Sequence, residues 1–318
     1  MLRFYTVLVM FLIVTSFITP LHYSIAQKSV LPEWIRNIFL WYGQKQISEQ
    51  ELLQAVEYLI SQRIIEVTTQ NANKIIDRGD FFVTYYSNPN SIYEYSAREW
   101  IQDFQYFETQ IEYLNSEFLL PYDIEIVAKE CDETNAFYDW QTKQIIICYE
   151  FMDYVYENFE SNYGNEYTTE DKSLMALHVI DFVFYHELGH VLVDIYQLPI
   201  TGLEENAVDQ FATFFMLLSE AESDYEGIVG QDILFDVGTW FLIQAELDYE
   251  PIYWDTHGLD IQRFYNISCY AYGQHPQYNQ DLITEGWLPE ERAVNCEYEY
   301  SVLESSWNEI LAPYYKKT

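Results

Sequence analysis

Two histidines and a glutamate in the segment Tyr185–Asp194, YHELGHVLVD, have the types and spacing of a metal site with a neighbouring base. His186 and His190 are four residues apart, so on a helix they share one face, with Cβ atoms roughly 5–6 Å apart. Both imidazoles can then bind one ion. Glu187 projects about 100° around the helix from His186, where it can accept a proton from a metal-activated water. The H-E-x-x-H pattern therefore indicates zinc-dependent hydrolysis.

The motif requires a rigid helix and a third metal ligand, and the sequence offers both. From Lys172 to Tyr196 there is no proline, and the only glycine lies inside the motif. Most of these residues are apolar, which predicts a buried helix. Catalytic zinc usually takes three protein ligands. A second helical pattern, GLEENAVDQFATFFMLL, carries Glu205 and Asp209 four residues apart, so an acidic ligand is at hand.

The sequence HELGH followed by EENAVD resembles the thermolysin-like zinc proteases, in which a glutamate is the third metal ligand. The resemblance implies that zinc is bound by His186, His190 and Glu205. It also implies that Glu187 is the general base and that Asp209 orients a ligand histidine by accepting its N–H. The gap of 15 residues between the second histidine and the glutamate is shorter than is usual for this class.

A larger part of the chain, roughly from Gly79 to Pro313, resembles a family of secreted bacterial and archaeal metallopeptidases. The similar segments are CDETNAFYDWQTKQIIICYE, the HELGH helix, GLEENAVDQFA, HGLDIQRFYNISCYAYG and LPEERAVNCEYEY. Within GLEENAVDQFA, Glu204 is the alternative to Glu205 as third ligand. The resemblance implies an α+β, zincin-like fold and zinc peptidase chemistry, and it indicates no particular substrate.

The composition is that of a folded, strongly acidic protein. The chain has 318 residues, of which 49% are hydrophobic and 18% aromatic, enough to bury a full core. Fifteen Lys and Arg stand against 51 Asp and Glu, giving a formal net charge of −36. Such a surface repels nucleic acid phosphates and anionic lipid headgroups, so we expect neither as a partner.

The N-terminal segment Met1–Ala26 has the pattern of a signal peptide. Arg3 precedes an apolar run from Phe4 to Ile18, which is shorter than the roughly 20 residues that span a bilayer. Cleavage before Gln27 predicts an exported protein, secreted or at the cell surface, with no lasting membrane span. Retention of the segment as an anchor is the alternative.

Residues 27–74 are predicted to form a helical accessory module and linker, ahead of a metallopeptidase domain over residues 75–318. Two helical patterns lie between Leu31 and Val67, with Gly43 at the turn and a capping box of Ser48 and Glu51. The module resembles one found in secreted and surface proteins of ammonia-oxidising archaea. It attaches or dimerises through exposed Trp in one interpretation, and packs on the main domain in the other.

The main domain combines a small N-terminal strand region with the central metal-binding helix and a mostly helical C-terminal half. Strands are predicted at Phe81–Tyr86, Ile124–Lys129, Asn135–Tyr138 and Gln144–Cys148, and a long amphipathic helix over Ala97–Phe118. Later helices are predicted at Phe211–Leu218, Ile233–Leu247, Leu259–Tyr272 and Val302–Tyr314. Asn135 and Ala136 begin NAFY, which resembles the substrate-binding edge strand of thermolysin-like enzymes. An ordinary hairpin strand is the alternative.

Four cysteines in an exported chain predict two disulfides, with three connectivities to choose from. Cys131 and Cys148 are equidistant from the point between Asp139 and Trp140, so a hairpin turning there places them opposite each other. Cys269 and Cys296 then form the second disulfide. None of the four stands in a C-x-x-C pair, which argues against zinc binding by cysteine.

The segment HGLDIQRFYN holds further polar candidates. In thermolysin-like enzymes a His, Tyr or Arg outside the metal triad stabilises the developing oxyanion, and the resemblance implies that His257 does so here. Alternatively, His257 caps a loop and Arg263 pairs with a surface carboxylate. His178 precedes His186 on the same helical stripe and is predicted to be a core histidine.

Together these patterns predict an exported zinc-dependent peptidase that acts on a peptide or protein substrate. It would hydrolyse peptide bonds by a metal-activated water, with Glu187 as general base. Two alternatives stay open: a non-catalytic cell-surface binding protein with a structural zinc, and a zinc hydrolase of a non-peptide amide. The intact Glu187 favours an enzyme, because a structural zinc site needs no base.

Overall fold

The computed structural model describes residues 33–61, 75–93, 97–103, 105–218, 229–247 and 252–316. The chain divides into two compact units, Met1–Lys74 and Ile75–Thr318. The expected signal peptide, Met1–Ala26, and the linker over residues 68–74 lie outside the described residues.

The first unit contains two helices, α2 (Glu33–Gly43) and α3 (Glu49–Ser61). The capping box that starts α3 is formed: Ser48 N–H donates to Glu51 Oε2 at 2.7 Å, and Glu51 N–H donates to Ser48 Oγ at 3.2 Å. Ile35 and Leu59 are buried. Among the side chains described in this unit, the exposed large apolar ones are Leu40, Trp41, Tyr42, Leu53 and Tyr58.

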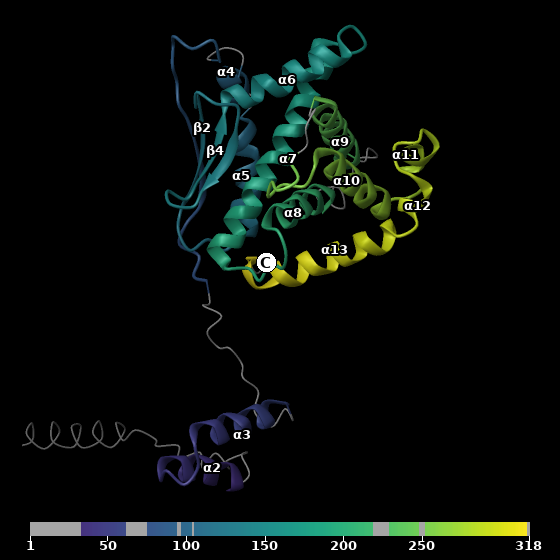
Figure 1. The fold of residues 1–318 in the computed structure, drawn as a ribbon. Helices are drawn as coiled ribbons and strands as arrows, with labels where there is room; N and C mark the ends of the chain where they lie inside the picture. The colour runs from purple at the N-terminus through teal and green to yellow at the C-terminus, as the bar shows by residue number, and fades with distance from the viewer. Residues whose placement is uncertain are drawn as a thin grey trace, which may run out of the picture. The chain divides into compact units, whose positions relative to one another are not determined.

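The second unit begins with a four-stranded sheet in the order β1-β2-β4-β3. The strands are β1 (Phe81–Tyr85), β2 (Ile124–Lys129), β3 (Ala136–Asp139) and β4 (Gln144–Cys148). β1, β2 and β4 run parallel, whereas β3 pairs antiparallel with β4 and forms an edge. Figure 1 shows β2 and β4 at one side of the unit, with helices α5 (Tyr106–Glu117) and α7 (Thr169–Tyr196) beside them.

The single long helix predicted over Ala97–Phe118 is wrong. The structure has a short helix α4 (Glu99–Asp103) and a separate helix α5 (Tyr106–Glu117). Gln105 between them has a φ of 49°, a left-handed conformation that interrupts the helical hydrogen bonds. The new direction lets the Tyr106 hydroxyl donate to Asp181 of α7. A tertiary contact therefore overrides the local periodicity.

The rest of the unit is helical; the helices predicted for the C-terminal half are present, whereas the helix directly after β4 was not predicted. Its helices are α6 (Tyr149–Tyr163), α7 (Thr169–Tyr196), α8 (Glu204–Leu218), α9 (Val229–Leu247), α10 (Asp260–Gln274), α11 (Gln280–Thr284), α12 (Glu290–Ala293) and α13 (Cys296–Leu311), followed by the 3₁₀ helix η2 (Ala312–Tyr314). The last α-helix starts six residues earlier than the predicted Val302.

Helix α7 is the centre of this arrangement, and it packs against α6, α8, α9, β3 and β4 (Figure 1). By length and composition it could cross a membrane, but most of its apolar window is buried inside the unit, as expected for a core helix. Aromatic rings fill the space around it. Phe107 of α5 lies 5.6 Å from Phe184 of α7, and Phe182 lies 5.7 Å from Phe241 of α9, measured between ring centroids.

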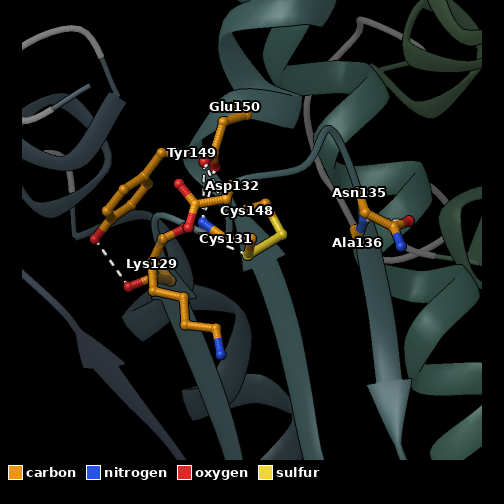
Figure 2. The surroundings of a disulfide bond; sticks show 9 residues. Lys129, Cys131, Asp132, Asn135, Ala136, Cys148, Tyr149 and Glu150 are labelled. Atoms are coloured by element: carbon orange, nitrogen blue, oxygen red, sulfur yellow. Dashed lines mark hydrogen bonds between the residues drawn. A yellow bond between two sulfur atoms is a disulfide. The ribbon is translucent and has the colours of Figure 1, made fainter. Parts of the chain in front are cut away.

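The predicted disulfide between Cys131 and Cys148 is present, but the hairpin turn predicted between Asp139 and Trp140 is wrong. Asp139 pairs with Gln144, so the β3–β4 hairpin turns after Gln141 and not after Asp139. Cys131 instead follows the end of β2, whose last residue Lys129 lies beside Cys148 of β4 in the parallel register. The disulfide, with Cα atoms 5.5 Å apart, therefore joins the ends of two parallel strands (Figure 2).

The second disulfide, Cys269–Cys296, joins α10 to α13 with Cα atoms 5.1 Å apart. The two helices are very close there, since a Cβ atom at Gly273 would lie 2.2 Å from the carbonyl oxygen of Cys296. Only glycine fits this position. The bridge thus fixes the C-terminal helix onto α10.

Candidate metal centre

Helix α7 carries the HELGH motif into the interior. A capping box starts the helix: Asp171 N–H donates to Thr168 Oγ1 and Thr168 N–H donates to Asp171 Oδ2, each at 3.1 Å. The helix then continues for 28 residues. His186 and Glu187 are only 4% and 6% exposed, so neighbouring apolar side chains hold these polar groups in place.

Helix α8 approaches α7 at the glycine of the motif. A Cβ atom at Gly189 would lie 2.9 Å from Cβ of Val208 and 3.1 Å from a ring carbon of Phe211. These distances are shorter than van der Waals contact, so the helices can pack this closely only because residue 189 has no side chain. The first turn of α8 therefore lies beside the motif histidines.

Glu205, in that first turn, faces both histidines. Its Oε2 atom lies 3.2 Å from Nε2 of His186 and 3.2 Å from Nε2 of His190. The Glu205 side chain is 20% exposed, so its carboxylate is partly accessible while the histidines are mostly enclosed. Both imidazole nitrogens therefore face the same carboxylate oxygen.

Two outer carboxylates hold the other nitrogens of these rings. His186 Nδ1 lies 2.7 Å from Asp209 Oδ1, and His190 Nδ1 lies 2.8 Å from Glu204 Oε1. Each ring therefore has its Nδ1 atom on an outer carboxylate and its Nε2 atom facing Glu205. Glu204 and Glu205, between which the sequence left a choice, thus occupy different places: Glu205 is central and Glu204 supports His190 from outside.

Arg263 of α10 holds Asp209 in turn. Its Nε donates to Asp209 Oδ2 at 2.8 Å and its second terminal nitrogen donates to Oδ1 at 2.6 Å, a two-point ion pair. Burial raises the pKa of Asp209, but the charges and hydrogen bonds of Arg263 and His186 outweigh burial and lower the pKa to about 2. The alternative of a surface carboxylate as the Arg263 partner is wrong, because the Asp209 side chain is only 14% exposed.

His257, on the loop before α10, reaches the same carboxylate. Its Nε2 lies 3.0 Å from Glu205 Oε2, and its Nδ1 lies 3.3 Å from Asp255 Oδ1. His257, His186 and Glu205 thus each offer one donor atom, and these three atoms all lie within 4.8 Å of one another. The His257 side chain is 45% exposed, much more than the side chains of the motif histidines.

Glu187 lies beside this cluster and does not contact Glu205. Its Oε2 accepts a hydrogen bond of 2.8 Å from the backbone N–H of Tyr138 in the edge strand β3. Burial raises the pKa of the Glu187 carboxyl, and the neighbouring positive charge of His186 and His190 opposes that rise. The carboxylate is thus held in one orientation from the strand side.

A cleft of about 730 Å³ opens over these groups. Its walls come from three sources: the edge strand β3 with Asn135, Ala136 and Trp140, the motif on α7, and the start of α8. A second cavity of about 560 Å³, lined by residues of α8, α10 and the loop before α10, shares His257 with the first. The candidate substrate residues Asn135 and Ala136 therefore lie in the same cleft as the HELGH motif.

The charges around the cluster favour a bound cation. Burial lowers the pKa of His186, yet hydrogen bonds to Asp209 and Glu205 raise it to about 9. Burial likewise raises the pKa of Glu205, but hydrogen bonds from the three histidines hold it far below its usual range. Imidazole nitrogens and a carboxylate oxygen are ligands that a divalent transition metal prefers. The donor set therefore fits such an ion.

Some candidates lie away from this centre. His178 is one of them: its Nδ1 pairs with Asp236 Oδ2 of α9 at 2.6 Å, and its side chain is 14% exposed. A partly buried histidine with a carboxylate partner agrees with the structural role predicted for it. The four cysteines are all engaged in the disulfides described above, so no free thiol is available to a metal.

Three residues of the site were missed by the sequence analysis. Asp255 precedes His257 by two residues, and this D-x-H spacing was the available signal. Asp194 follows His190 by four residues, one helical turn further on, and lines the cleft. Tyr138 was placed on the edge strand, but its contact with Glu187 depends on the packing of β3 against α7, for which the sequence contains no signal.

Fold and site together define a mixed α and β protein with a candidate metal centre beside a His-Glu-x-x-His helix. The chain belongs to the family described as "Putative metallopeptidase", whose model matches residues 86–311, all within the second unit. Membership indicates a peptidase with a metal cofactor. No curated protein and no solved structure matches the chain.

Proposed function

We propose that the chain is an exported zinc-dependent peptidase with a zincin-like domain of the glutamate-ligand type. One observation carries the proposal: Nε2 of His186 and Nε2 of His190 both face Oε2 of Glu205, beside the buried carboxylate of Glu187. Zinc bound there would supply Lewis-acid chemistry, lowering the pKa of a water molecule and polarising a carbonyl.

In this proposal the chain's own residues hold the ion through His186, His190 and Glu205. Asp209 and Glu204 accept the Nδ1–H of the two histidines, which keeps each Nε2 lone pair directed at the ion. Four carboxylates would then surround one dication, which together with Arg263 offsets most of their negative charge.

The edge strand β3 offers backbone groups to an extended substrate. Cys148 N–H donates to Asn135 carbonyl, so the alternation along an antiparallel strand turns the backbone of Ala136 away from β4, toward the open edge. A peptide added to this edge would pair in the manner of a further strand, with alternate side chains in the cleft. That arrangement places a peptide carbonyl within reach of Glu187.

Glu187 then acts as general base and acid. Its Oε2 is held by the Tyr138 N–H, so Oε1 is the atom that accepts a proton from water and returns it to the leaving amine. The proposal assigns to His257, whose Nδ1 faces Asp255, a hydrogen bond to the oxygen on which negative charge develops; to donate it, Nε2 must leave Glu205 Oε2. Water is partly excluded because Glu187 is buried.

A mixed peptide library tests the proposal. The purified mature protein with one equivalent of zinc should cleave part of the library, a chelator should stop cleavage, and added zinc should restore it. Fragment masses would identify the scissile bonds and show whether cleavage is internal or terminal. A protein that holds zinc and cleaves no peptide would contradict the proposal and favour a binding protein with a structural zinc.

The assignment of the third ligand makes a separate prediction. Glu205→Ala should remove an atom that faces both ligand nitrogens, and zinc affinity should fall by far more than in Glu204→Ala. The outer variants Glu204→Ala and Asp209→Asn should weaken binding by about 10- to 100-fold without abolishing it. Competition with a zinc indicator measures all three. If Glu204→Ala strips zinc and Glu205→Ala does not, the assignment is wrong by one residue.

Export belongs to the same proposal. The leader pattern of Met1–Ala26 and the two disulfides agree with an oxidising compartment, where the protein is secreted or held at the cell surface without a lasting membrane span. The exposed Leu40, Trp41 and Tyr42 of the helical module support a role in surface attachment. The partner of the protein would be a peptide or protein substrate, and the formal net charge of −36 disfavours binding to nucleic acid.

A further inference from the structure

Residue Tyr138 joins the edge strand to the metal-binding helix at two points. Its backbone N–H donates to Glu187 Oε2 at 2.8 Å, and its hydroxyl donates to Asp194 Oδ2 at 2.7 Å. Glu187 and Asp194 are seven residues apart on α7, which is two helical turns, so they lie on one face. One strand residue therefore spans two turns of the helix that carries the base.

Lys143 adds a third connection from the other end of the hairpin. Its ammonium donates to the same Asp194 oxygen that accepts the Tyr138 hydroxyl. Both Lys143 and Asp194 have side chains that are 29% exposed, so the ion pair is shielded from water in part. Burial lowers the pKa of Lys143, but the combined effects of Asp194 and Tyr122 raise it above its usual value, which keeps the lysine charged.

The backbone of Lys143 is unusual for a lysine. Its φ of 59° lies in the left-handed region, where hairpins of this kind place glycine or asparagine. A lysine there costs conformational energy that glycine would not. Non-glycine residues in such conformations often serve a function that glycine cannot, and here the side chain supplies the contact to Asp194.

We propose that Asp194 is a positioning residue that, through Tyr138 and Lys143, fixes the edge strand β3 against α7. The strand then holds its Tyr138 N–H on Glu187 and presents its open edge at a constant distance from the base. The inference rests on the proposed peptidase function for its kinetic consequence. Its structural consequence, a strand held to the helix by Asp194, stands without that function.

A double-mutant cycle of Tyr138→Phe and Asp194→Ala tests the contact. Each single variant removes the hydroxyl–carboxylate hydrogen bond, and each should lower kcat by about 10- to 100-fold at unchanged zinc content, since small displacements of a catalytic group have effects of this size. The double variant should be no slower than the slower single one, because both changes remove the same interaction. Fully additive losses would overturn the proposal.

Tyr85→Phe is the matched control. Tyr85 lies on the opposite edge strand β1, and its hydroxyl donates to Glu108 of α5 at 2.8 Å, which is also a strand-to-helix bond. Tyr85→Phe should lower thermal stability about as much as Tyr138→Phe and leave kcat unchanged. Equal losses of kcat in the two variants would show that Tyr138 and Asp194 contribute only to stability.

Lys143→Gly separates positioning from folding still further. Glycine accepts the left-handed conformation, so the variant should be as stable as the parent or more so, yet its kcat should fall because the ammonium is lost. Hydrogen exchange of the backbone amides of residues 136–139 gives a readout that does not depend on activity. Exchange should become at least threefold faster in the variants of Tyr138, Asp194 and Lys143. Unchanged exchange would refute the role of Asp194 in holding the strand, whereas a parent protein that cleaves no peptide would refute only the proposed peptidase function.

Discussion

Replacing Glu187 with glutamine should reduce peptide hydrolysis by about 10²- to 10⁴-fold, which corresponds to roughly 3–5 kcal/mol of activation free energy. The amide has the size of the carboxylate and can still accept the Tyr138 N–H, but it cannot take up a proton. Zinc content and the melting temperature should stay at the parental values, because Glu187 makes no contact with Glu205. Initial rates on the best substrate from the peptide library measure the loss.

Glu166→Gln is the control for this change, since it makes the same substitution at an exposed position before α7. Its rate should equal that of the parent. Parental activity in Glu187→Gln, with zinc bound, would show that another group accepts the proton. Loss of zinc in that variant would instead show that Glu187 belongs to the ligand set.

Replacing either motif histidine with alanine should remove the metal. His186→Ala and His190→Ala each delete one of three converging donors, and a zinc content of about one per chain should fall close to zero after dialysis. His186→Ala should also destabilise the fold, because it leaves the buried Asp209 with one hydrogen-bond partner fewer. Elemental analysis and thermal unfolding measure the two effects.

His178→Ala provides the matched control on the same helix. Its imidazole pairs with Asp236 and not with a carboxylate of the candidate metal centre, so zinc content should be unchanged while stability falls. Retention of zinc by both motif variants would show that the ion lies elsewhere. Loss of zinc from His178→Ala at an unchanged melting temperature would point to a site that includes α9.

Much of the fold could be predicted because its signals are local. The strands β2 and β4 and the helix α7 lie where alternation, apolar runs and the absence of proline placed them. The family, too, was identified from short segments around HELGH, and the match over residues 86–311 confirms a metallopeptidase family. Spacing within one helix is enough to place His186, Glu187 and His190 together.

The remaining features depend on contacts between distant elements. The break at Gln105 and the turn after Gln141 have no local glycine or proline signal, so periodicity alone extended the helix and misplaced the hairpin. The different environments of Glu204 and Glu205 follow from the angle at which α8 meets α7. The connection between Tyr138 and Asp194 requires the register of β3 on the helix, which is a tertiary property.

The absence of a side chain at Gly189 affects how this site can change during evolution. A single methyl group at this position would lie 2.9 Å from Val208 and push apart the two helices that carry the histidines and Glu205. Ligand distances in a metal site tolerate deviations of only about 0.2 Å. A mutation that alters no ligand could thus adjust metal affinity through helix spacing alone, which makes residue 189 a point of selection distinct from the chemistry it borders.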